Sequence, residues 1–107
     1  MHRVREIESH ELAALTARGP VQLLDVRTGE EVARGMIEGA IHIPLALLPL
    51  RVGELDPGTV TVVYCRSGAR SAQACAYLAA QGFAHSYNLK GGILEWVRSG
   101  GTVALPG

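Results

Sequence analysis

The chain has 107 residues, with ten basic and ten acidic side chains and a formal net charge of zero at pH 7. This length predicts a single domain over residues 1–107, and the balanced charge excludes a basic surface for nucleic acid or for an anionic membrane. The longest apolar run, residues 43–50, is too short to cross a bilayer. The amino terminus lacks the apolar core of a signal peptide, so we expect a cytoplasmic protein.

Short apolar runs and turn-forming residues alternate along the chain in a pattern that predicts strands alternating with helices. The expected strands are residues 4–7, 21–26, 40–43, 60–64 and 86–89. The expected helices are one that Ser9 caps and that ends at Gly19, a short one over 30–34, an irregular proline-broken one over 45–55, and two more over 71–80 and 92–99. This order predicts an α/β fold with a mostly parallel central sheet and helices on both faces.

The strand expected at 60–64 leads directly into Cys65 and a short loop before the next helix. The loop residues are Arg66, Ser67, Gly68, Ala69 and Arg70. Backbone N–H groups of such a loop and of the first helical turn would point at the cysteine sulfur, and the helix dipole and the two arginines add positive charge. The pKa of a cysteine thiol, ordinarily ~8.5, falls by one to several units in these surroundings. Cys65 is therefore the candidate nucleophile, as a thiolate.

The other polar residues of interest lie outside this loop. Asp25 and Arg27 lie at the carboxyl end of the second expected strand, where open α/β sheets place their ligands. They form either a surface ion pair, worth ~1 kcal/mol or less, or a pair that braces the site. We expect Cys75 to be a buried core residue and His42 to serve the scaffold. The spacing of the cysteines and histidines matches no metal-ligand pattern, which predicts no metal site.

Three separate stretches together resemble the rhodanese domain, the sulfurtransferase family. The first is Leu-Asp-Val-Arg-Thr-Gly-Glu-Glu at 24–31, followed by Gly-Met-Ile-Glu-Gly-Ala-Ile-His-Ile-Pro at 35–44. The second is the loop Tyr-Cys-Arg-Ser-Gly-Ala-Arg-Ser at 64–71, and the third is Asn-Leu-Lys-Gly-Gly-Ile-Leu-Glu-Trp at 88–96 with Gly100 after it. The resemblance covers nearly the whole chain and is to the compact single-domain members. One departure is Met36, where the family often has histidine, and it affects packing or substrate detail.

The resemblance implies a rhodanese-like fold and sulfur transfer without a cofactor. The Cys65 thiolate would take a sulfane sulfur from a donor such as thiosulfate, become a persulfide, and pass the outer sulfur to a thiophilic acceptor such as cyanide or a thiol. Arg66 would attract the small anionic donor, and Arg70 would help to close the loop. Supporting roles behind the loop fall to Asp25, Arg27 and Ser71.

There are three alternatives to a free sulfurtransferase. A cysteine-dependent phosphatase or arsenate reductase needs five residues between cysteine and arginine, whereas four separate Cys65 from Arg70, which favours a single sulfur atom over a tetrahedral oxyanion. A silent binding module of this family lacks the cysteine, so the presence of Cys65 disfavours that function. A persulfide relay to a protein acceptor uses the same chemistry, and the sequence leaves it open beside a free sulfurtransferase.

Overall fold

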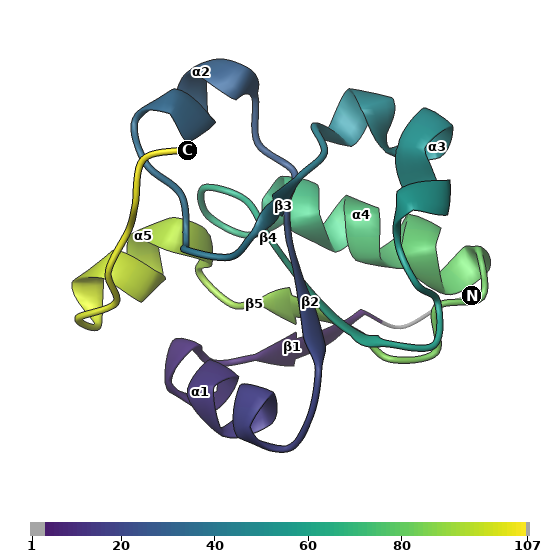
Figure 1. The fold of residues 1–107 in the computed structure, drawn as a ribbon, viewed down its shortest axis with the longest axis horizontal. Coiled ribbons are helices and arrows are strands. Elements are labelled where there is room, and N and C mark those ends of the chain that lie inside the picture. Colours follow the sequence, from purple (N-terminus) through teal and green to yellow (C-terminus); the bar gives the residue numbers. More distant parts are fainter. Residues whose placement is uncertain (1–3, 107) are drawn as a thin grey trace.

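The computed structural model describes residues 4–106, in which a parallel sheet is covered by helices on both faces (Figure 1). The strands are β1 (Arg5–Ile7), β2 (Val21–Asp25), β3 (Ile41–His42), β4 (Val60–Tyr64) and β5 (Ser86–Leu89). Their order in the sheet is β1-β5-β4-β2-β3, and every pairing is parallel. The α/β fold predicted from the sequence is confirmed. Because β4 is the middle strand, the residue that follows it lies at the centre of the carboxyl edge.

Four α-helices connect these strands: α1 (Ser9–Ala17), α2 (Gly29–Ala33), α3 (Leu48–Arg51) and α4 (Ala69–Ala80). A fifth, α5 (Gly92–Arg98), follows the last strand. Short 3₁₀ turns at Leu45–Leu47 and Val52–Glu54 flank α3, which confirms the irregular helix expected at 45–55. The longest helix, α4, has 12 residues. Among residues 4–106, no helix combines the length and the apolar character needed to cross a membrane.

Three helices begin one or two residues earlier than the sequence predicts, and for α2 the difference is only that it begins at Gly29. Ser9 is the first residue of α1 and not its cap, because Glu8 has the extended backbone of an N-cap and its N–H donates to the carboxylate of Glu11 at 2.8 Å. The helix α4 begins at Ala69, two residues before the expected start, because Gly68 caps it with a φ of +114°. Ala69 and Arg70 therefore belong to the first turn of α4, and the loop between strand and helix is only three residues long after Cys65.

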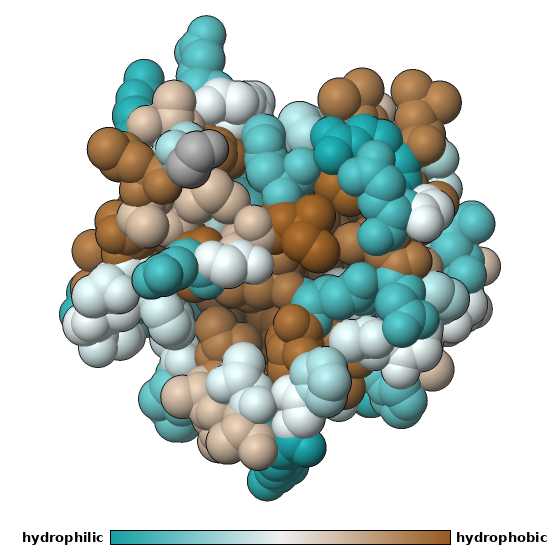
Figure 2. Space-filling view, in the orientation of Figure 1, coloured by the Kyte–Doolittle hydropathy of each residue, from teal (hydrophilic) through white to brown (hydrophobic). Residues whose placement is uncertain are grey.

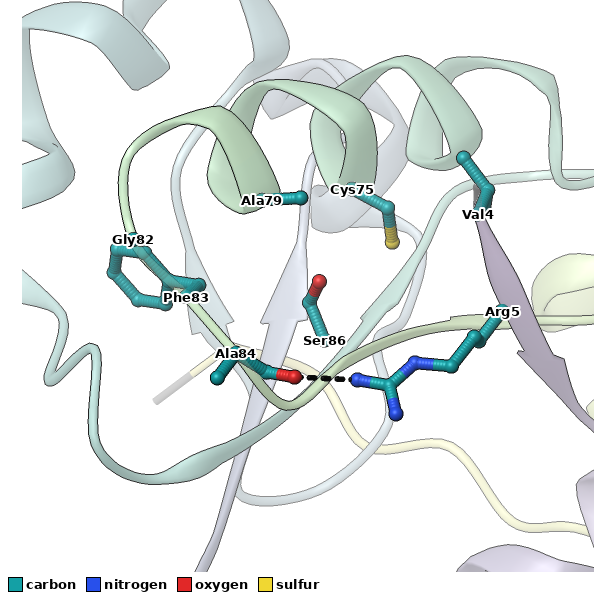
Figure 3. Close-up of a pocket in the computed structure, with 8 residues that line it drawn as sticks. All are labelled: Val4, Arg5, Cys75, Ala79, Gly82, Phe83, Ala84 and Ser86. Carbon is teal, nitrogen blue, oxygen red and sulfur yellow. Dashed lines mark hydrogen bonds between the residues drawn. The ribbon is translucent and has the colours of Figure 1, made fainter. Parts of the chain in front are cut away.

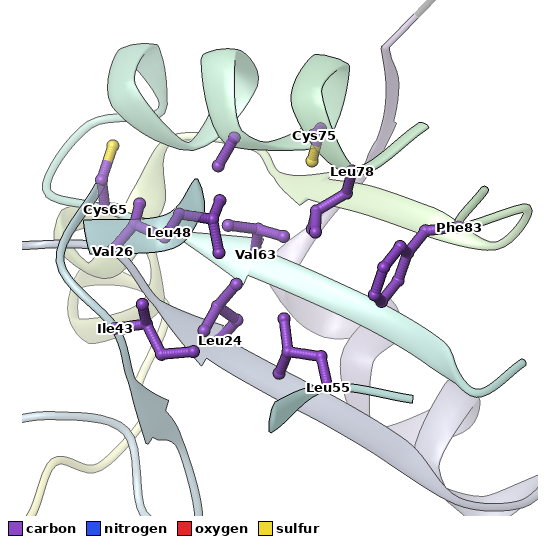
Figure 4. Close-up of a cluster of buried hydrophobic side chains, with 11 residues drawn as sticks. Leu24, Val26, Ile43, Leu48, Leu55, Val63, Cys65, Cys75, Leu78 and Phe83 are labelled. Carbon is purple, nitrogen blue, oxygen red and sulfur yellow. The ribbon is translucent and has the colours of Figure 1, made fainter. Parts of the chain in front are cut away.

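The alternating side chains of β4 divide the core between the two faces of the sheet. Val63 and then Cys65 pack on the face covered by α3 and α4, as Figure 4 shows. Val62 and Tyr64 pack on the opposite face, against residues of α1 and α5. Each fully buried aliphatic side chain contributes roughly 1.5–3 kcal/mol of burial free energy, so both faces hold β4 in place. This packing makes the backbone that presents Cys65 rigid.

Candidate active site

Cys65 lies at the carboxyl end of β4, with 1% of its surface exposed. Its Sγ accepts hydrogen bonds from the backbone N–H of Gly68 at 3.1 Å and of Ser71 at 3.4 Å. The hydroxyl oxygen of Ser71 also lies 3.4 Å from the sulfur. The sulfur therefore sits inside a ring of donors from the loop and from the first turn of α4, in the arrangement that the sequence predicts.

Burial and hydrogen bonding act on the Cys65 thiol in opposite directions. Removal from water raises its pKa, but the hydroxyl of Ser71 and the backbone N–H groups of Ser71, Gly68 and Ser67 outweigh that effect and lower the pKa below its ordinary value. Donors that are fixed by the backbone favour the anion because they need no reorganisation when charge develops on the sulfur. Cys65 is thus set up to ionise inside a largely dry site.

The backbone at Cys65 is fixed from a second direction by the start of α5. The N–H of Ile93 donates to the carbonyl of Cys65 at 2.9 Å, and the N–H of Leu94 donates to the carbonyl of Arg66 at 3.2 Å. Gly92 allows this approach, since its φ is +62° and a Cβ there would lie 2.6 Å from the carbonyl oxygen of Cys65. Gly92 is a site residue that the sequence analysis missed, and its place in the last of the three family-like stretches was the available signal.

The guanidinium of Arg70 binds Glu31 of α2. Its Nη1 and Nη2 donate to the two carboxylate oxygens of Glu31 at 2.6 and 2.8 Å. Glu31 also accepts the backbone N–H of Thr28 at 3.0 Å, and the Arg70 hydrogen bond holds its pKa at about 2. The ion pair ties the first turn of α4 to α2, which is compatible with the expected closing role of Arg70. Glu31 as its partner was not foreseen.

Asp25 and Arg27 form a buried ion pair. The Arg27 Nη2 lies 2.7 Å from the Asp25 Oδ2, and the two side chains are 6% and 0% exposed, so the alternative of a surface pair is wrong. The same guanidinium donates to the carbonyl of Gly35 at 2.7 Å and lies over the ring of Tyr64. The pair therefore holds the chain after α2 against the end of β2. Within the described residues, the pair makes no hydrogen bond to Cys65.

Arg66 is exposed and lines a pocket of ≈330 Å³ beside the cysteine loop. The other residues that line it are Arg27, Glu31, Arg34, Gly35, Ile93, Leu94, Val97 and Val103. Neither Arg66 nor Arg34 forms an ion pair within residues 4–106. The apolar side chains of Leu94 and Val97 are 48% and 51% exposed. The pocket has the size of a small ligand site and combines free positive charge with an apolar wall.

The second cysteine lies in a different environment. Cys75 on α4 is 2% exposed and belongs to the core, which confirms the prediction for it. It faces another pocket, of ≈370 Å³, between the end of α4 and the start of β5 (Figure 3). Burial raises the pKa of the Cys75 thiol to about 12, so it stays protonated at neutral pH. Cys65 is thus the thiol with the environment of a nucleophile.

Two remaining predictions concern histidine and metal. His42 Nε2 lies 2.7 Å from the backbone carbonyl oxygen of Arg27, which ties β3 to the end of β2 and agrees with a scaffold role. In the described part of the chain, no three His, Cys, Asp or Glu side chains gather into a group that could hold a metal ion.

The fold and the site together define a class of protein. A parallel α/β sheet presents one buried cysteine at the carboxyl end of its central strand, and N–H groups at the start of a helix stabilise the sulfur as an anion. Such a site suits covalent group transfer through a thiolate.

The chain belongs to the rhodanese-like domain family, whose sequence profile matches residues 8–99. It is 46% identical over 104 residues to a sulfurtransferase of Allochromatium vinosum, covering 96% of this chain and 97% of the relative. It is 32% identical to the thiosulfate sulfurtransferase GlpE of Shewanella oneidensis, with coverage of 90% and 95%. The crystal structure of a rhodanese-related protein from Thermoplasma volcanium superimposes with a TM-score of 0.87 at 30% identity, covering 95% of this chain and 99% of that one. These relatives support sulfur transfer as the general activity, and the family expected from the three motifs is confirmed.

Proposed function

We propose that the protein is a sulfurtransferase in which Cys65 carries a sulfane sulfur from a small anionic donor to a thiophilic acceptor. With thiosulfate, the Cys65 thiolate attacks the sulfane sulfur, an S–S bond forms to the cysteine, and sulfite leaves with the electron pair of the broken S–S bond. With cyanide as acceptor, the carbon attacks the outer sulfur of the Cys65 persulfide, thiocyanate leaves, and the thiolate returns. Charge and atoms balance in both steps without a metal or an organic cofactor.

The observation that carries this proposal is the ring of donors around Sγ. The Cys65 thiolate is the attacking group of the first half-reaction and the leaving group of the second, so both steps gain from donors that stabilise it. The N–H groups of Gly68 and Ser71 lie at fixed positions 3.1 and 3.4 Å from Sγ and favour this thiolate. Arg66, exposed at the rim, adds long-range attraction for an anionic donor.

The position of Arg70 argues against a phosphatase or an arsenate reductase. Those enzymes need the arginine that follows the loop to bind the oxyanion. Here both terminal nitrogens of the Arg70 guanidinium bind the carboxylate of Glu31. Four residues between Cys65 and Arg70 also leave a tight loop. Both features favour a single sulfur atom as the group that the site holds.

A second candidate function is a persulfide relay to a protein acceptor. Its support is the exposed apolar wall beside the loop, formed by Leu94, Val97 and Val103 next to Arg66. Figure 2 shows hydrophobic side chains gathered on this side of the molecule, over α5 and the carboxyl-terminal segment. A relative from Bacillus subtilis, 36% identical over 76 residues, is named a putative sulfur carrier protein, although the match covers 41% of its length.

The test is the intact mass of the protein after incubation with thiosulfate. We expect one added sulfur atom, located on Cys65 by peptide mapping, and its loss as thiocyanate when cyanide is added. The variant Cys65→Ser should gain no sulfur and show no thiocyanate formation, because a serine hydroxyl cannot carry a persulfide. The matched control Cys75→Ala should keep both, at a stability cost of about 1–2 kcal/mol for a small core cavity. Sulfur loading of Cys75 in place of Cys65 would refute the assignment.

A further inference from the structure

Asn88 of β5 lies behind the cysteine loop, 3% exposed, and connects two parts of it. Its side-chain Oδ1 lies 2.5 Å from the Oγ of Ser71, and its Nδ2 donates to the backbone carbonyl of Gly68 at 3.1 Å. Ser71 is fully buried, and its Oγ is also 3.4 Å from the Sγ of Cys65. A continuous chain of polar contacts therefore runs from the reactive sulfur to Asn88.

Hydrogen counting restricts how this chain can be arranged. The carbonyl of Gly68 only accepts, so the Asn88 amide must direct its NH₂ group there and its oxygen toward Ser71. Glu6 Oε2, 3.5 Å from the same NH₂ group, is a further acceptor on that side. The only hydrogen available between Ser71 Oγ and Asn88 Oδ1 is that of the serine hydroxyl. This single hydrogen cannot serve Asn88 and the sulfur at the same time.

We propose that Asn88 is a positioning residue that competes with Cys65 for the hydroxyl hydrogen of Ser71. When Cys65 is a neutral thiol, Ser71 donates to Asn88 and its oxygen accepts the S–H of Cys65. When Cys65 is a thiolate, the hydroxyl rotates to donate to the sulfur, and Asn88 Oδ1 loses that bond. No covalent bond changes in this step, since the proton that leaves Cys65 goes to solvent or to a base in the medium.

This inference rests on the proposed role of Cys65 as the nucleophile, but its readout is thiol ionisation and needs no sulfur transfer. Charged groups also lie around the sulfur and the network. Arg70, paired with Glu31 of α2, interacts with the charge of Cys65 and of Asp25 at the end of β2, Glu6 of β1 lies 3.5 Å from Asn88 Nδ2, and Arg66 is in the loop itself. None of them is changed in the variants below, so their effect on the pKa of Cys65 cancels in the comparison.

The test is a double-mutant cycle with Ser71→Ala and Asn88→Ala, made in a Cys75→Ala background so that one thiol reacts. The pKa of Cys65 is taken from the rate of alkylation by iodoacetamide across a pH series. Ser71→Ala should raise the pKa of Cys65 both in the protein that keeps Asn88 and in the protein that carries Asn88→Ala. The rise should be larger, by about one pKa unit, in the protein without Asn88, because the hydroxyl is then free to donate to the thiolate at all times.

Two outcomes would overturn the inference. If Ser71→Ala raises the pKa of Cys65 equally with and without Asn88, then Asn88 only tethers Gly68. A smaller rise in the pKa of Cys65 without Asn88 would mean that Asn88 aims the hydroxyl at the sulfur and does not compete for it.

If Asn88→Ala fails to fold, Asn88→Asp replaces it. Its carboxylate binds the hydroxyl more strongly, so Ser71→Ala should then leave the pKa of Cys65 nearly unchanged, and a rise as large as with Asn88 present would refute the competition.

Discussion

Arg70 and Glu31, which are 39 positions apart in the sequence, are joined by two hydrogen bonds of 2.6 and 2.8 Å. This pair is the contact between the helix that follows the cysteine and the short helix α2. Because Ser71, the next residue, donates to Sγ, any shift of Arg70 moves a donor of the sulfur. The geometry around Cys65 therefore depends on a carboxylate from a distant part of the chain.

The variant Glu31→Gln tests the Arg70–Glu31 ion pair through the pH dependence of the free energy of unfolding. The pKa of Glu31 is lowered to about 2 from 4.5, so the ion pair contributes stability that is fully present above pH 4.5 and is lost as the pH falls toward 2. The variant should be less stable than the wild type by about 1 kcal/mol or less near neutral pH, since the pair is partly exposed. This difference, measured by denaturant unfolding, should vanish near pH 2. The neighbouring Glu30→Gln is the control, and a loss that persists at pH 2 would contradict the assignment.

Arg66→Ala should mainly raise the KM for thiosulfate, because the exposed Arg66 is expected to attract the dianion and not to hold the loop. The difference in kcat/KM between wild type and variant should shrink as salt is added, since exposed charges are screened over ~10 Å at 0.1 M. Arg18→Ala, which removes an exposed arginine at the end of α1, should leave the KM unchanged. A difference that does not change at high salt would instead indicate a structural role for Arg66.

Gly92→Ala should displace the cysteine loop. The new Cβ would lie 2.6 Å from the carbonyl oxygen of Cys65, at a position that also has a positive φ. Gly39→Ala is the matched control, because Gly39 has a φ of +85° with nothing within 4 Å of the added Cβ. We expect the control to cost about 1–2 kcal/mol in unfolding free energy and to keep sulfur transfer. Gly92→Ala should cost more and lose at least about 10-fold in kcat/KM, equivalent to ~1.4 kcal/mol in the barrier. Equal behaviour of the two variants would show that the close approach has no functional effect.

Loop length is tested by one inserted glycine between Ser67 and Gly68. The wild type should hydrolyse an aryl phosphate negligibly. The insertion should abolish sulfur transfer, because the N–H groups of Gly68 and Ser71 would no longer converge on Sγ. Glycine is the insert of choice since it accepts the unusual dihedral angles of such a loop. Both proteins are assayed with thiosulfate and with the phosphate ester, and ready phosphatase turnover by the wild type without sulfur transfer would refute the interpretation of the spacing.

The sequence by itself was enough to predict the cysteine loop and the family. The loop is a contiguous strand, turn and helix, so its donors to Sγ come from residues within six positions of Cys65. Local backbone geometry of this kind follows from the order of residue types and does not need long-range contacts. The alternation of strands and helices likewise predicted the parallel sheet, because parallel neighbours require crossover helices.

What only the tertiary structure decided is which distant residues complete the site. Glu31 reaches Arg70 from α2, Gly92 brings α5 onto the backbone of Cys65, and Asn88 reaches Ser71 from β5. Asp25 and Arg27 could be a surface pair or a buried one until the packing of residue 35 against β2 was known. These contacts depend on strand order and on the register between strands. A residue pattern along the chain determines which face of an element is apolar, but it does not determine which element lies beside it.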